Sequence, residues 1–133
     1  MRPILMNTEM VNAILAGRKT QTRRLIKERH LRVLDSPYHK EHSEVPDKVL
    51  LEKLCELPYQ SGDVLYVRES WCKGSLNGGA EQYFYRADDN DFHCKWRPSI
   101  HMPKEAARIF LRVTGVRVER LQDVTVEGIL EEG

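Results

Sequence analysis

The chain has 133 residues, the size of a single domain and enough to bury a modest core without disulfides. Its 21 Lys and Arg nearly balance 20 Asp and Glu, which excludes a protein that binds nucleic acid through overall charge alone. No run of about 18 apolar residues occurs, and the N-terminus does not resemble a secretion signal. These features favour a soluble, cytoplasmic protein that does not enter a membrane.

The charges are unevenly distributed along the chain. Residues 1–34 carry eight Lys or Arg against two Glu, a net charge of +6, so the remaining residues carry −5. This asymmetry favours one positive face on a nearly neutral protein. A fold whose ion pairs are internal and functionally inert can show the same distribution.

Residues 7–16 are predicted to form a short amphipathic helix. Asn7 or Thr8 serves as the N-cap, Glu9 lies in the positive first turn, and apolar residues recur at helical spacing. Gly17 follows the last apolar residues, where a helix commonly ends in a left-handed conformation. The chain is therefore expected to turn at Gly17 and to leave in an extended conformation.

Residues 19–24 read Lys-Thr-Gln-Thr-Arg-Arg, in which threonines alternate with long polar side chains, a pattern that favours a β-strand. Two interpretations of this strand stay open. Its charges can protect a solvated edge strand from aggregation. The same cations, with hydroxyls between them, also suit a face that binds anions or nucleic acid.

The middle of the chain is predicted to be mixed. Residues 35–48 are polar and interrupted by proline, which indicates an exposed excursion, and residues 46–57 favour a short helix. A turn at residues 61–63 leads into the clearest predicted strand, residues 64–71, and residues 82–87 pair back with it as a hairpin.

The three cysteines, Cys55, Cys72 and Cys94, are odd in number and widely spaced. This pattern favours free thiols in a reducing cytosol over a disulfide framework.

The possible metal ligands do not converge. His39 and His42 form one pair and His93 and Cys94 another, but the four ligands of a structural zinc site are not evident, so surface histidines in a polar loop are the better interpretation. The acidic residues 88–91 lack the Gly and the later Glu of a calcium-binding loop, which indicates a solvated turn. The sequence therefore predicts no metal site.

Residues 96–103 are aromatic and fixed by prolines, and one helical turn is expected at residues 104–107. Trp96 can stack on a base while His101 offers a polar contact to the same ligand. The other interpretation, which is the more common for a single Trp, is that Trp96 fills the core. Residues 108–121 alternate like a long strand, and Gly115 marks a bulge that bends it around a barrel.

Three sequence blocks in this order resemble the ASCH family, whose fold is similar to that of the RNA-binding PUA domains. They are Gly-x-Lys-Thr-x-Thr-x-Arg at residues 17–24, Gly-Asp-Val-Leu at residues 62–65, and Leu-Gln-Asp-Val at residues 121–124 running into Glu-Glu-Gly at residues 131–133. The chain is similar to ASCH proteins carried by bacteriophages and prophages. The resemblance covers most of the chain, but residues 27–60 match no motif.

The resemblance implies one α+β domain over residues 1–133, built as a small PUA-like β-barrel with short flanking helices. Related proteins continue beyond the position of Gly133, so the chain is expected to be truncated at its C-terminus. The expected partner is RNA or a modified nucleoside. Neither a cofactor nor a membrane partner is expected, and the oligomeric state stays open.

The resemblance also implies a set of working side chains. In family members that hydrolyse N4-acetylcytidine, these are the Lys and the second Thr of Lys-Thr-x-Thr and a Glu after the late strand, which correspond here to Lys19, Thr22 and Glu132. Glu69, at the end of a strand, is the substitute carboxylate. The ligand contacts expected around them come from Arg18, Thr20, Arg23, Arg24, Glu69, Trp96 and His101.

The chemistry of this set is coherent. A threonine hydroxyl is a poor nucleophile until a base takes its proton. A lysine becomes that base when burial or a neighbouring cation, here Arg24, lowers its pKa. A carboxylate then carries the proton to the departing amine. In a regular strand Lys19 and Thr22 would face opposite sides, so this assignment requires a bulge or turn between them.

Three classes of function follow from these observations. The first is an amidohydrolase of N4-acylated cytidine, and the second is a non-catalytic RNA-binding module that uses the basic face and aromatic side chains. The third is a phage structural or interaction protein in which the basic segment is incidental, with Lys19 a surface lysine and Thr22 a turn hydroxyl. Nucleoside hydrolysis identifies the first class, and salt-sensitive RNA binding without turnover identifies the second.

Overall fold

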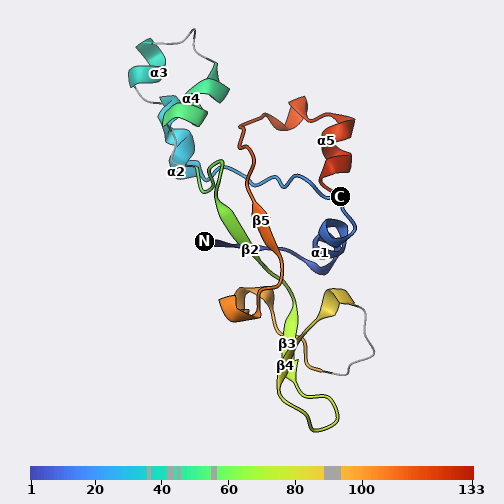
Figure 1. The fold of residues 1–133 in the computed structure, drawn as a ribbon. Coiled ribbons are helices and arrows are strands. Elements are labelled where there is room, and N and C mark those ends of the chain that lie inside the picture. Colours follow the sequence, from blue (N-terminus) through green and yellow to red (C-terminus); the bar gives the residue numbers. More distant parts are fainter. Residues whose placement is uncertain (36, 42–43, 45, 55–56, 89–93) are drawn as a thin grey trace.

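The computed structural model describes residues 1–133 except 36, 42–43, 45, 55–56 and 89–93. In this part of the chain, short helices and two β-sheets form a small α+β protein (Figure 1), which confirms the predicted class at that level. In chain order the elements are β1 Arg2–Leu5, α1 Thr8–Leu15, α2 Glu28–Leu31, α3 Pro37–Glu41, α4 Asp47–Leu54, β2 Val64–Arg68, β3 Trp71–Gly74, β4 Gln82–Tyr85, β5 Phe110–Arg112 and α5 Val126–Glu131.

The central sheet has β2 in its middle. β1 pairs with β2 in parallel, and β5 pairs with it antiparallel, with Leu111 opposite Leu65. Val67 in β2 is fully buried, as expected for a strand that is covered on both faces. Ile4 of β1 and Val11 of α1 belong to the same core cluster, so α1 packs against this sheet.

Helix α1 begins and ends as predicted. Asn7 is the N-cap, and its side chain accepts a hydrogen bond from the N–H of Met10 at 2.8 Å. Gly17 has a φ of 74°, and the N–H of Arg18 returns to the carbonyl of Ala13. This glycine-closed end directs the chain away from the helix and toward α5.

A hairpin forms as predicted, but the strand predicted over residues 64–71 is divided: β2 ends at Arg68, and β4 pairs with β3, with Trp71 opposite Tyr85. Trp71 also belongs to a second buried cluster with Met102 and Ala106. Figure 1 shows the hairpin at one end of the molecule and helices α2, α3 and α4 at the other, with the central sheet between them. The molecule therefore has a separate packing centre on each side of Arg68, where β2 ends.

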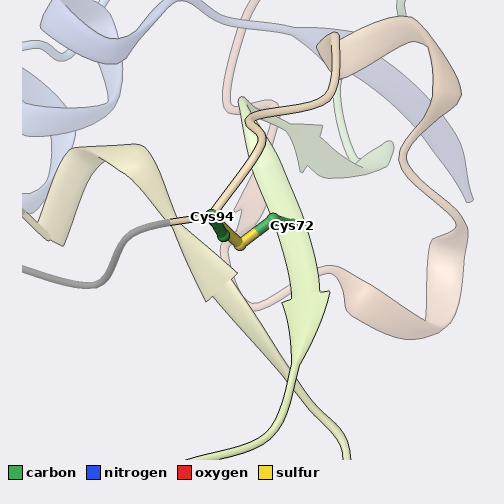
Figure 2. The surroundings of a disulfide bond; sticks show 2 residues. All are labelled: Cys72 and Cys94. Atoms are coloured by element: carbon green, nitrogen blue, oxygen red, sulfur yellow. A yellow bond between two sulfur atoms is a disulfide. The ribbon is translucent and has the colours of Figure 1, made fainter.

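Cys72 of β3 forms a disulfide with Cys94 (Figure 2), and their Cα atoms lie 6.5 Å apart. The prediction of free thiols at these two positions is wrong. The cysteines are 22 residues apart in sequence, but the chain returns to β3 after the hairpin, where Arg97 forms a β-bridge with Trp71. Cys55 lies outside the described residues.

The basic residues 19–24 do not form a strand, contrary to the prediction. The N–H groups of Thr20 and Gln21 both donate to the carbonyl of Glu131, at 2.6 and 3.0 Å. Glu131 is the last residue of α5, and a helix end offers isolated carbonyls rather than the continuous ladder that a strand needs.

The long strand predicted over residues 108–121 is confirmed only within β5, and Gly115 lies beyond that strand rather than at a bulge. Beyond Arg112 only Val113 continues the pairing, with hydrogen bonds to Asp63 and Gly62 at the turn that precedes β2. The described strands form a three-stranded sheet and a two-stranded sheet, and the closed PUA-like barrel stays a prediction.

The predicted helix in residues 46–57 is confirmed as α4, and the turn predicted at residues 104–107 is confirmed as a 3-10 helix, Lys104–Ala106. The polar residues 35–48 are partly helical rather than a simple excursion, because they contain α3. The acidic turn predicted at residues 88–91 lies outside the described residues except for Asp88, and His42 and His93 lie wholly outside them.

Candidate functional site

The basic segment, residues 17–24, runs from the end of α1 to the C-terminal end of α5 (Figure 1). Besides the two backbone hydrogen bonds to Glu131, the side-chain amide of Gln21 donates to the Glu131 carboxylate. The segment's cations therefore lie near the last carbonyls of a helix, where partial negative charge favours positive side chains. The segment that follows α1 thus meets the C-terminal end of the chain at this point.

Lys19 is the buried cation of the segment, with 8% of its surface exposed. Its Nζ donates a hydrogen bond of 2.6 Å to the main-chain carbonyl of Glu132. Burial lowers the pKa of Lys19, and the positive charges of Arg24 and Arg23 lower it further, against the opposing effect of Glu132. This is the direction expected for a buried lysine beside Arg24, and it brings the amine closer to acting as a base.

The carboxylate of Glu132 is held by Arg23. The Arg23 backbone N–H donates to Oε1 at 2.9 Å, and Arg23 Nη1 donates to Oε2 at 2.7 Å. Burial works to raise the pKa of Glu132, but these hydrogen bonds and the charges of Arg23 and Lys19 together hold it below the ordinary value. The carboxylate is therefore ionised and fixed in orientation.

Arg23 is enclosed by further contacts within the protein. Its Nε donates to Glu119 at 2.6 Å, and its Nη1 donates to the carbonyl of Gly128 at 2.9 Å. A Cβ at Gly128 would lie 2.6 Å from Arg23 Nη2, so this glycine leaves room for the guanidinium. Hydrogen bonding to Glu119 and Glu132 raises the pKa of Arg23. Arg23 thus acts as a framework for Glu132.

Thr22 and Arg24 form the outer part of the cluster. Arg24 Nη1 donates to the Oγ1 of Thr22 at 2.8 Å, and Arg24 Nη2 donates to the carbonyl of Leu5 at 3.1 Å. Since the Thr22 oxygen accepts, its own O–H is left available to donate. Lys19 thus contacts the main chain of Glu132, whereas the Thr22 side chain contacts Arg24, and within the described residues no hydrogen bond joins Thr22 to Lys19 or Glu132.

A surface hollow of about 320 Å³ lies beside Arg24. Residues from β1, from the end of β2, from a 3-10 turn and from the loops line it: Pro3, Ile4, Leu5, Arg24, Tyr59, Arg68 and Ile100. Tyr59 and Arg68 are not among the site residues predicted from the sequence. The only local signal for Arg68 is its place after four bulky strand residues, where a polar side chain can emerge from the sheet.

The substitute carboxylate, Glu69, lies in different surroundings. It is only 1% exposed, and Arg108 binds both of its oxygens, at 3.1 and 2.9 Å. Arg108 also pairs with Asp88 at 2.6 Å and lies over the ring of Tyr85. Glu69 therefore belongs to an ion-pair network around the hairpin, and no hydrogen bond or ion pair in the described chain links it to Lys19.

The other predicted contact residues lie at the periphery. Arg18, Thr20 and His101 are exposed, and Trp96 is half-buried. His101 ends the 3-10 turn Ser99–His101, directly after the hollow-lining Ile100. Among the described residues, no hydrogen bond or ion pair connects these four side chains to Lys19, Arg23 or Glu132, the residues called here the Lys19 cluster.

Among the described residues, no three His, Cys, Asp or Glu side chains are arranged to hold a metal ion. The helices in that part of the chain are too short or too polar to cross a membrane. Compared with protein-family models, curated proteins and solved structures, the chain gives no significant match. The site is therefore interpreted from its own geometry.

Proposed function

We propose that this protein binds a modified nucleoside or RNA through Lys19, Thr22 and Arg24, in the manner of the ASCH proteins that its sequence resembles. The reaction that these side chains suit best is hydrolysis of the N4-acyl group of an acylated cytidine. The observation that carries the proposal is the 2.6 Å contact between Lys19 Nζ and the Glu132 carbonyl, across 113 positions of sequence. The fold agrees with the proposal at the level of a small α+β protein, and a closed PUA-like barrel is part of the proposal.

The first proposed step is attack by Thr22 on the acyl carbonyl. Lys19 takes the hydroxyl proton, since its burial and its cationic neighbours favour the neutral amine. Arg24 already donates to the Thr22 oxygen, so its charge stabilises the alkoxide as it develops. This step requires the Lys19 amine to exchange its contact with the Glu132 carbonyl for one with the Thr22 hydroxyl.

Glu132 has the second role. It relays the proton from Lys19 to the amine of cytidine as the C–N bond breaks, which leaves the acyl group as an ester on the Thr22 oxygen. A water molecule, whose proton Lys19 takes, then attacks this ester, and the Thr22 oxygen recovers the proton as the carboxylic acid leaves. Arg23 holds both carboxylate oxygens, which fixes the direction from which the proton arrives. The lowered pKa of Glu132 means that the protonated form is transient, as suits a relay rather than a stored acid.

A second candidate function is RNA binding without chemistry. The contacts of Arg23 with both Glu132 oxygens and of Lys19 with a carbonyl also suit a framework that only anchors α5. In that case Arg18 and Arg24, which have no carboxylate partner among the described residues, contact phosphates, and Trp96 supplies a stacking surface. RNA binding that weakens with salt, without hydrolysis, identifies this function. A phage structural or interaction role would show neither activity.

The proposed location is the cytoplasm, as expected from the sequence. The Cys72–Cys94 disulfide argues against a reducing compartment, where such bonds are rare. Alkylation of free thiols in intact cells, followed by mass spectrometry, tests the location. Alkylated Cys72 supports a reducing cytoplasm, and full protection contradicts it.

The test of the main proposal is chromatographic. The protein is incubated with N4-acetylcytidine, and cytidine is measured for wild type, Lys19→Ala and the matched control Lys27→Ala, which removes an exposed lysine outside the cluster. Cytidine is expected with wild type and the control and not with Lys19→Ala. No product from folded wild-type protein would rule out this substrate and leave RNA binding as the conclusion.

A further inference from the structure

The hollow beside Arg24 is positively charged at two places. Arg24 and Arg68 come from segments 44 positions apart in sequence and line the same hollow of about 320 Å³, which is at the lower end of the range for small-molecule sites. Pro3, Leu5 and Ile100 give it apolar walls, and Tyr59 adds an aromatic side chain. An anionic group attached to an apolar or aromatic body matches this lining.

No carboxylate among the described residues pairs with Arg68. Its Nη1 makes a long 3.5 Å contact with the Ile100 carbonyl, and its guanidinium lies 5.6 Å from the centre of the Tyr66 ring. Its Nε is buried and has no hydrogen-bond partner in the described part of the chain. A buried donor without an acceptor is uncommon in folded proteins, because its lost hydration is not replaced.

Arg24 likewise has no carboxylate partner among the described residues. Its contacts are with the Thr22 hydroxyl, the carbonyls of Arg23 and Leu5, and a sulfur, all of which are neutral. By contrast, Arg23 and Arg108 are each paired with two carboxylates. Within the described chain, therefore, Arg24 and Arg68 lack carboxylate partners, whereas Arg23 and Arg108 have them.

We propose that this hollow binds a phosphate group, with Arg24 and Arg68 as its two cationic contacts. A guanidinium presents paired N–H donors that match the oxygens of a phosphate, and both arginines line the hollow. Arg24 is the link between the hollow and the proposed nucleophile, because it lines the hollow and donates to Thr22, and the proposal places the phosphate and the base of one ligand on the two sides of Arg24. This inference rests on the proposed function and assigns it a phosphorylated nucleoside or an RNA strand rather than a free nucleoside.

The experiment is calorimetric titration with three probes: cytidine, cytidine 5′-monophosphate and inorganic phosphate. Wild type is compared with Arg68→Gln and with Arg112→Gln, a matched control that removes an exposed arginine of β5 outside the hollow. The monophosphate is expected to bind wild type about tenfold or more tightly than cytidine does. This advantage should disappear in Arg68→Gln and persist in Arg112→Gln, and inorganic phosphate should bind wild type and not Arg68→Gln.

The outcomes separate the site from the function on which it rests. If inorganic phosphate binds in an Arg68-dependent way but neither cytidine compound does, the phosphate site stands and the nucleoside proposal fails. Equal affinity of wild type for cytidine and its monophosphate, with no binding of inorganic phosphate, would overturn the site, and this comparison needs no variant. An Arg68→Gln protein that keeps the full advantage of the monophosphate would overturn it as well.

Discussion

Glu69 and Glu132 are bound in a similar way and have different surroundings. In each, both carboxylate oxygens accept hydrogen bonds from a single arginine, Arg108 or Arg23. Glu69 is 1% exposed, whereas the Glu132 side chain is 31% exposed. An arginine–glutamate pair by itself is therefore not evidence of a functional site.

The neighbours of the two carboxylates make the difference. Around Glu69 lie Tyr85 and Asp88, which complete a network that holds the hairpin against the rest of the chain. Beside Glu132 lies Lys19, a second titratable group, whose pKa is lowered by burial. Glu69, which is buried and paired, fits a structural role. Glu132, which is partly exposed and lies beside a lysine with a lowered pKa, fits a catalytic role.

The largest expected effect is on the buried carboxylate. Glu69→Ala leaves Arg108 partly buried without its main partner and is expected to lower the free energy of unfolding by about 3–5 kcal/mol. The measurement is urea unfolding followed by circular dichroism. Asp88→Ala, which removes a more exposed partner of the same arginine, is the control and should cost less than about 1 kcal/mol. Similar small losses for both variants would contradict the structural role of Glu69.

Reduction of the Cys72–Cys94 disulfide is expected to have the next largest effect. The bond closes a loop across 22 positions, and its loss should destabilise the folded state by about 2–4 kcal/mol. Thermal unfolding with and without a reducing agent measures this. Because the disulfide lies at the hairpin and not beside Lys19, nucleotide binding should be retained at temperatures below the lowered melting temperature. Loss of binding together with reduction would show that the two sides are coupled.

A smaller effect on stability is expected at Glu132. Its pKa is lowered in the folded protein, so its contribution to stability is present above the ordinary value of 4.5 and is lost as the pH falls through the lowered value. Glu132→Gln should therefore reduce the free energy of unfolding by about 0.5–1 kcal/mol at neutral pH and by nothing in strong acid. Unfolding of both proteins across this pH range tests the point. A constant difference at every pH would contradict the ion-pair assignment.

The smallest change concerns the pH at which Lys19 loses its proton. If neutral Lys19 is the base, kcat/KM should rise with pH and level off below the ordinary lysine value of 10.5, because the pKa of Lys19 is lowered. Since Arg24 contributes to this lowering, Arg24→Gln should move the inflection to higher pH, whatever it does to the absolute rate. An inflection that does not move would contradict the prediction that the charge of Arg24 lowers the pKa of Lys19.

Local signals in the sequence were sufficient for the local elements. Asn7 and Gly17 define the two ends of α1, and the run of bulky residues from Val64 predicts β2, because capping and burial depend on neighbouring residues. The predicted strand at residues 19–24 is wrong because the partner of that segment is the end of a helix more than 100 positions away. Composition cannot reveal such a partner.

In the candidate site too, the features that depend on partners distant in sequence could not be predicted from local signals. The pairing of Lys19 with Glu132 came from family resemblance and not from spacing, and the Cys72–Cys94 bond was missed because it depends on the return of the chain after the hairpin. Arg68 could not be singled out either. In the sequence it is one of many arginines, and only the folded chain shows which of them lack a carboxylate partner among the described residues.

The most direct test of the account is the rate of N4-acetylcytidine hydrolysis by Thr22→Ala and Thr22→Ser beside wild type. Thr22 contributes only a hydroxyl that accepts from Arg24, so these variants leave the ion pairs of Glu132 intact. The account predicts that Thr22→Ala loses about 100-fold or more in rate, while Thr22→Ser, which keeps a hydroxyl, retains activity. Equal rates for Thr22→Ala and wild type would contradict the assignment of Thr22 as nucleophile and with it the proposed reaction at this site.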